Sequence, residues 1–71
     1  MALSGKYGQL DIPKIAAEEP VFILRGQDTL AVSTIRIYRA FVESHNPALA
    51  RDLDKEIKKF LEWPGVKKMP D

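Results

Sequence analysis

Residues 44–47 read Ser-His-Asn-Pro, and this short stretch predicts the end of one helix and the start of another. An asparagine at the N-cap accepts a hydrogen bond from a free backbone amide of the first turn. A proline at the first helical position loses no intrahelical bond, because the amide there has no partner anyway. Asn46 and Pro47 therefore predict a tight turn, and the helices on either side of it are expected to form a hairpin with an apolar seam.

The residues after Pro47 predict the second helix. Apolar side chains recur about every 3.6 positions while charged side chains occupy the opposite side, which is the pattern of an amphipathic helix. Asp54 and Lys58 form a favourable pair four residues apart, and Pro64 with Gly65 ends the helix. The apolar stripe consists of Leu49, Leu53, Ile57, Phe60, Leu61 and Trp63.

The residues before Ser44 predict the first helix, although a strand is the rival interpretation. The many β-branched residues between Ser33 and Val42, and the near-alternation of Ile35, Ile37 and Arg39, would suit a strand. We favour a helix because the helical spacing extends over three turns and ends at a recognisable stop, with Asp28 or Ser33 available as the N-cap. The helical stripe consists of Leu30, Ile35, Tyr38, Phe41 and Val42.

Residues 20–26 predict a β-strand. Pro20 opens this segment, Gly26 closes it, and the residues between them are mainly β-branched, aliphatic or aromatic. A lone strand leaves its backbone amides and carbonyls without partners, so it needs a neighbouring strand. Residues 6–12 are one candidate, and the same strand of a second copy of the chain is the other. We expect the second arrangement, in which Val21, Phe22, Ile23 and Leu24 form the dimer strand.

The predicted fold class is α+β, a strand-helix-helix unit that intermolecular strand pairing completes in a homodimer. Residues 1–19 are expected to form a flexible N-terminal arm, residues 20–63 the single domain, and residues 64–71 a C-terminal tail. A chain of 71 residues buries only about 60% of its unfolded surface. Such small domains usually need disulfides, a metal or a partner subunit, and the absence of cysteine leaves the partner subunit as the leading expectation.

The composition also excludes several classes of protein. No apolar run approaches the length of about 20 residues that a membrane span needs, and the first residues lack the pattern of a secretory signal, so we expect a cytoplasmic protein. With no cysteine and with His45 as the one histidine, neither a metal site nor a cofactor is expected. The net charge of +1 disfavours a dedicated nucleic-acid binder.

No combination of residues predicts catalysis. His45 falls in the turn between the helices, where a surface or helix-capping role is the simplest interpretation. The polar segment that directly follows the predicted strand and the arginines of the first helix are the candidates for an interaction surface. This surface comprises Arg25, Gln27, Asp28, Arg36 and Arg39.

Residues 19–31 read Glu-Pro-Val-Phe-Ile-Leu-Arg-Gly-Gln-Asp-Thr-Leu-Ala. This segment resembles a set of short bacterial and prophage-type proteins that share a Glu-Pro-Val-Phe-x-Leu-Arg-x-Gln-Asp-x-Leu-Ala core followed by a helical region. In those proteins a proline often follows the Leu-Ala pair and opens the helix, whereas Val32 stands there in this chain. The resemblance implies a small stand-alone protein and supplies no catalytic residue.

Two functions follow as hypotheses. The first is a homodimeric accessory protein that works by binding another protein and has no enzymatic activity. The alternative is a DNA-binding regulator, because a strand followed by two helices is similar to the ribbon-helix-helix repressors, whose paired strands enter the major groove. In this chain that strand would offer few polar side chains to base edges, so DNA is the less favoured partner.

Overall fold

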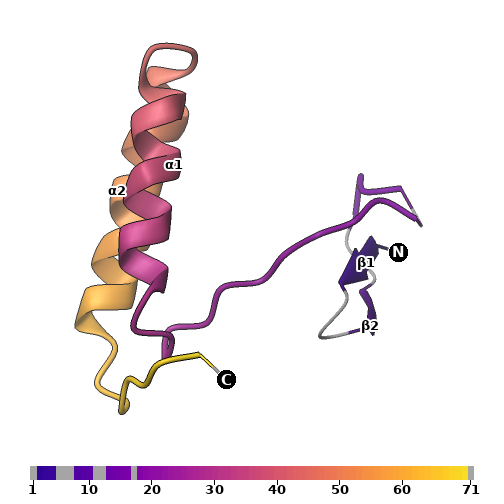
Figure 1. The fold of residues 1–71 in the computed structure, drawn as a ribbon. Coiled ribbons are helices and arrows are strands. Elements are labelled where there is room, and N and C mark those ends of the chain that lie inside the picture. Colours follow the sequence, from indigo (N-terminus) through magenta and orange to yellow (C-terminus); the bar gives the residue numbers. More distant parts are fainter. Residues whose placement is uncertain (1, 5–7, 11–12, 17, 71) are drawn as a thin grey trace.

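The computed structural model describes residues 2–4, 8–10, 13–16 and 18–70, and its main feature is an antiparallel pair of helices (Figure 1). Helix α1 spans Ala31–Glu43 and helix α2 spans Pro47–Glu62. Two short strands, β1 (Ala2–Ser4) and β2 (Gly8–Leu10), form a separate antiparallel pair near the N-terminus. In the part of the chain that is described, no helix is long and apolar enough to cross a membrane.

The turn between the helices is built as its sequence predicts. The side-chain oxygen of Asn46 accepts a hydrogen bond from the backbone amide of Leu49 at 3.1 Å, and Pro47 occupies the first turn of α2. The amides of His45 and Asn46 both donate to the carbonyl of Val42, at 2.9 and 2.8 Å, and so close the end of α1. The predicted helix boundary at residues 44–47 is therefore confirmed.

We expect the replacement Asn46→Ala to lower the free energy of unfolding by about 1 kcal/mol, because the Leu49 amide loses its acceptor. Urea unfolding followed by circular dichroism at one fixed protein concentration measures this change. His45→Ala is the matched control, since the exposed His45 is the preceding residue in the same turn. An equal loss in both variants would contradict the capping role.

The helical interpretation of residues 31–43 is also confirmed, but neither proposed N-cap fills that position. Leu30 is the N-cap residue of α1 and makes no side-chain capping bond. Asp28 instead acts one turn earlier, where its side chain accepts the amide of Leu30 at 2.8 Å and its carbonyl accepts the amide of Ala31 at 3.1 Å. The Thr34 hydroxyl donates to the Leu30 carbonyl at 2.8 Å.

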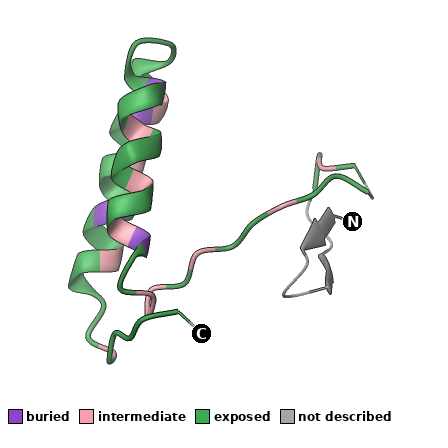
Figure 2. Cartoon of the chain, in the orientation of Figure 1, coloured by how far each residue is buried: buried purple, intermediate pink, exposed green. Residues whose placement is uncertain are grey.

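The core between the helices is small. Its buried apolar residues are Ala31, Val42, Ala50 and Ile57, and among the described residues no large side chain is completely buried (Figure 2). Two of the four are alanines, which allow close approach of the helix backbones but contribute little apolar area. Much of the apolar surface of the hairpin is therefore left outside this core.

The prediction of an α+β fold is wrong, because the chain folds as a helical hairpin. Residues 21–25 have no regular secondary structure, so Val21, Phe22, Ile23 and Leu24 form no dimer strand in this structure. They belong to an extended segment that leads into the hairpin, and Phe22 is 85% exposed (Figure 1). The run of apolar residues suggested a strand covered on both faces, but residues 21–25 belong to none of the described strands.

The intramolecular alternative has residues 6–12 as the neighbouring strand. Residues 6, 7, 11 and 12 lie outside the described part of the chain. Within that range the described strand β2 pairs with β1, in the register Ala2 to Leu10 and Ser4 to Gly8. The segment at 21–25 is thus left without a strand neighbour among the described residues.

The C-terminal tail returns to the base of the hairpin. The Lys68 amide donates to the Gln27 carbonyl at 2.8 Å, and the Thr29 amide donates to the Lys68 carbonyl at 2.9 Å. These two bonds form an isolated parallel bridge between Asp28 and Lys68. The open end of the hairpin is therefore tied by residues from before α1 and after α2.

Candidate functional site

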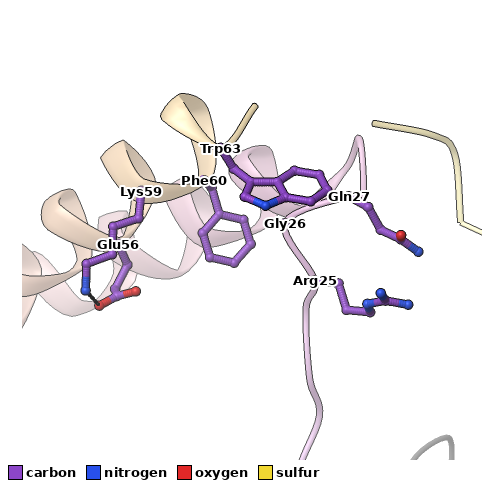
Figure 3. A pocket seen from close by; sticks show the side chains of 7 residues that line it. All are labelled: Arg25, Gly26, Gln27, Glu56, Lys59, Phe60 and Trp63. Atoms are coloured by element: carbon purple, nitrogen blue, oxygen red, sulfur yellow. Dashed lines mark hydrogen bonds and ion pairs between the residues drawn. The ribbon is translucent and has the colours of Figure 1, made fainter. Parts of the chain in front are cut away.

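A pocket lies where the segment before α1 crosses the C-terminal half of α2 (Figure 3). Its volume is about 410 Å³. The lining residues come from two places, the loop at 25–27 and the last two turns of α2 with the residue after it. They are Arg25, Gly26, Gln27, Glu56, Lys59, Phe60 and Trp63.

Local structure fixes both walls of this pocket. The loop wall is held by the Asp28 amide, which donates to the Arg25 carbonyl at 3.0 Å, and by the bond from the Lys68 amide to Gln27. On the other wall, Trp63 ends α2, and its amide donates to the Lys59 carbonyl at 3.1 Å. The backbone at Trp63 is extended, which turns the chain and its indole away from the helix axis.

The indole of Trp63 is in contact with two glycines. A side-chain carbon at Gly26 would meet the ring at 3.6 Å, an ordinary contact distance, whereas one at Gly65 would collide with the ring. Trp63 itself is 44% exposed, so part of the ring remains open to a ligand. The indole can therefore occupy this position only because residue 65 has no side chain, whereas a small side chain at position 26 would fit beside the ring.

These two glycines provide a matched pair of substitutions. We expect Gly65→Ala to displace the indole and shift the fluorescence of Trp63, and to reduce stability by about 1–3 kcal/mol through overpacking. Gly26→Ala is expected to leave both properties nearly unchanged. Since Trp63 is the one tryptophan of the chain, its emission spectrum reports the ring environment directly. Equal spectra for the two variants would contradict this account.

The charged side chains around the pocket differ in whether they have a partner. Lys59 and Glu56 form an ion pair at 3.1 Å within α2. Lys67 donates to the Phe60 carbonyl at 2.7 Å, where a cation is favourable because the C-terminal end of a helix carries a partial negative charge. Arg25 is exposed and has no ion-pair partner among the described residues. Arg25 is therefore the pocket cation that is available to a ligand.

The structure divides the residues predicted for an interaction surface. Arg25 and Gln27 line the pocket together, as Figure 3 shows, and Asp28 lies in the adjoining turn with its carboxylate bonded to the Leu30 amide. Arg36 and Arg39 lie on α1 and do not line the pocket. The five residues thus do not form one surface.

Arg39 has a structural role between the helices. Its Nε and Nη2 donate to the two carboxylate oxygens of Asp54 at 2.6 and 3.1 Å, and Nη1 lies 3.3 Å from Glu43. The hydrogen bond with Asp54, opposed by slight desolvation and helped by the charges of Asp54 and Glu43, raises the pKa of Arg39 above its usual value. These two hydrogen bonds to Asp54 join α1 to α2, so the guanidinium of Arg39 is not available to a ligand.

Four pocket residues escaped the sequence analysis as members of a site. Lys59 was expected on the charged face of the second helix and Phe60 and Trp63 on its apolar stripe, whereas Glu56 was assigned to neither. The available signal was the pair of aromatic residues three positions apart at the end of a helix, which places both on one side. The sequence does not show that this side of the helix lies next to Arg25, because that proximity depends on the hydrogen bonds between the C-terminal tail and the loop before α1.

A second feature is an exposed apolar surface along α1 and its N-cap residue. Phe41 is 76% exposed, Ile37 is 60% exposed and Leu30 is 45% exposed. Their spacing of seven and four residues aligns them along one side of the helix. We refer to Leu30, Ile37 and Phe41 as the apolar face.

Within the described residues, no group of three or more histidine, cysteine, aspartate or glutamate side chains is arranged to hold a metal ion. Comparisons with protein-family models, with curated protein sequences and with solved structures find no match. The pocket and the apolar face are thus the features on which a functional proposal can be built.

Proposed function

We propose that this chain is a homodimeric protein-interaction module without catalytic activity. The observation that supports it is the apolar face, which leaves two aliphatic side chains and one aromatic side chain exposed on a single side of α1. In the proposed dimer a second copy covers this face, and the two hairpins pack as a four-helix arrangement.

The apolar face and the charged residues of α1 lie on opposite sides. Ala31 is completely buried and marks the direction of α1 that faces α2. At about 100° per residue, Phe41 lies about 80° to one side of Ala31 and Arg39 about 80° to the other. Leu30 and Ile37 lie on the same side as Phe41, and the ion pair between Arg39 and Asp54 lies on the other side.

Helix α2 extends the apolar face. Taking buried Ala50 as the inward direction, Asp54 lies about 40° to one side, and Leu53 and Leu49 about 60° and 100° to the other. Since Asp54 meets Arg39, the side that carries Leu49 and Leu53 is the side that carries the apolar face of α1. Both leucines are half-buried, so the face continues across the groove between the helices.

The hypothesis of a ribbon-helix-helix DNA-binding regulator depended on a strand at residues 20–26. Because residues 21–25 form no strand, this hypothesis lacks the element that would enter the major groove. We therefore do not propose DNA binding for this chain.

Sedimentation equilibrium across about 1–500 µM tests the proposed dimer, since this range spans the usual affinities of small homodimers. The expected mass at the upper end is twice the chain mass of 8.0 kDa. A mass of one chain at every concentration would overturn the homodimer.

A further inference from the structure

We propose that the pocket between the 25–27 loop and α2 binds the C-terminal end of a partner peptide whose last residue is apolar. The proposal deepens the role of the chain as an interaction module by naming the ligand of a second surface. Its test does not depend on the dimer, because none of the residues that line the pocket belongs to the apolar face.

The floor of the pocket suits an apolar side chain. Phe60 and Trp63 present their rings from α2 and its end, and Figure 3 shows the indole lying beside Gly26. Aromatic rings gain most when another apolar or aromatic group packs against them. A volume of about 410 Å³ is at the small end for ligand pockets, which fits one or two residues at a chain end.

The rim of the pocket suits one carboxylate. Arg25 and Lys59 are cations and Glu56 is an anion, so the lining carries a net charge of +1. Lys59 is paired with Glu56, which leaves the guanidinium of Arg25 to receive the ligand. Arginine matches a carboxylate with two parallel hydrogen bonds, and capture of a terminal carboxylate is a recurrent mode of peptide recognition.

In Figure 3 the side chain of Arg25 extends from the loop beside Gln27 and away from Phe60. An exposed arginine changes rotamer within nanoseconds, so this geometry allows the guanidinium to turn toward a bound carboxylate. The amide of Gln27 lies on the same rim and can donate a further hydrogen bond to it.

The fluorescence of Trp63, the one tryptophan of the chain, reports binding directly. The probe is the N-acetylated tripeptide Ala-Ala-Phe with a free carboxylate, titrated into the full chain to about 5 mM. We expect a saturable spectral change, and binding about tenfold weaker for the same peptide with a C-terminal amide. We expect Arg25→Gln to weaken binding of the free acid by a similar factor, and Arg36→Gln, an exposed arginine outside the pocket, to leave it unchanged.

Several results would overturn this proposal. These are the absence of saturation with the free acid, equal affinity for the acid and the amide, and equal affinity of the Arg25→Gln variant and the unmodified chain. Equally tight binding of 3-phenylpropionate would assign the pocket to a small carboxylic acid instead of a peptide end. Sedimentation of the same samples separates the two proposals. A monomer that binds the free acid contradicts only the dimer, and a dimer that shows no saturable titration contradicts only the peptide site.

Discussion

Replacing Phe41 by glutamate is expected to convert the proposed dimer into a monomer. Phe41 is the most exposed member of the apolar face, and the two-fold symmetry of a homodimer places two copies of it in the interface. Burying a phenylalanine side chain contributes about 1.5–3 kcal/mol. Losing two of them raises the dissociation constant by at least about 100-fold, before the cost of burying a carboxylate is added.

Ala40→Glu is the matched control for this substitution. Ala40 is the neighbouring residue, it is exposed, and it receives the same charge in the same helix. At about 100° per residue it lies about 180° from buried Ala31, on the outer side of α1. Sedimentation equilibrium of both variants gives the comparison. A dimer that persists with Phe41→Glu, or that dissociates equally with Ala40→Glu, would show that the apolar face is not the interface.

Replacing Ile57 by alanine is expected to cost about 2–5 kcal/mol of unfolding free energy. Ile57 is the largest member of the four-residue core and is only 7% exposed, so its removal leaves a cavity between α1 and α2. A chain of this length is expected to have a total stability of about 4–11 kcal/mol, so the variant loses a large part of it. Urea unfolding followed by circular dichroism measures the loss at a fixed protein concentration.

Leu61→Ala is the control for the core substitution. Leu61 lies one turn further along α2 and is 56% exposed, so its truncation removes a similar volume without creating an enclosed cavity. Its expected cost is below about 1 kcal/mol. Comparable losses for the two variants would mean that the stability of the hairpin does not reside in the small core.

The helices could be predicted from the sequence because their signals are local. Asn46 and Pro47 define a boundary by their own chemistry, and the apolar spacing of residues on either side defines two helical stripes. The structure confirms both helices and the turn between them. What periodicity could not tell is how much of each stripe is covered, and Phe41 shows that a stripe residue can remain exposed.

The strand prediction was wrong because it rested on local signals alone, namely the composition of the segment and its boundaries at Pro20 and Gly26. Four consecutive apolar residues at 21–24 are typical of a strand buried on both faces, but a strand exists only if another segment pairs with it. In the described chain β2 pairs with β1, and the backbone next to the hairpin pairs with the tail at Lys68 instead. The bridge from Asp28 to Lys68 joins segments that are far apart in the sequence, so no local pattern encodes it.

The candidate site was half predictable for the same reason. Arg25 and Gln27 were recognisable as polar residues at the end of an apolar segment. Phe60 and Trp63 belong to a different element, and they complete the pocket only because the chain folds back on α2. Arg39 was predicted for the surface, yet the carboxylate of Asp54 engages it, and that pairing depends on the register of the two helices.

The bridge between Asp28 and Lys68 also has a consequence for the order of folding. The turn at residues 44–47 brings together residues that are close in sequence, so little chain entropy is lost when it forms. We therefore expect contacts between the two helices to form first at this end of the hairpin. The bonds of Gln27 and Thr29 to Lys68 join the most distant parts of the hairpin and close a ring around it. We therefore expect closure to be the last step and the most costly one in entropy. Removal of the final residues would open this ring and loosen the loop that carries Arg25, while the turn at Asn46 stayed intact.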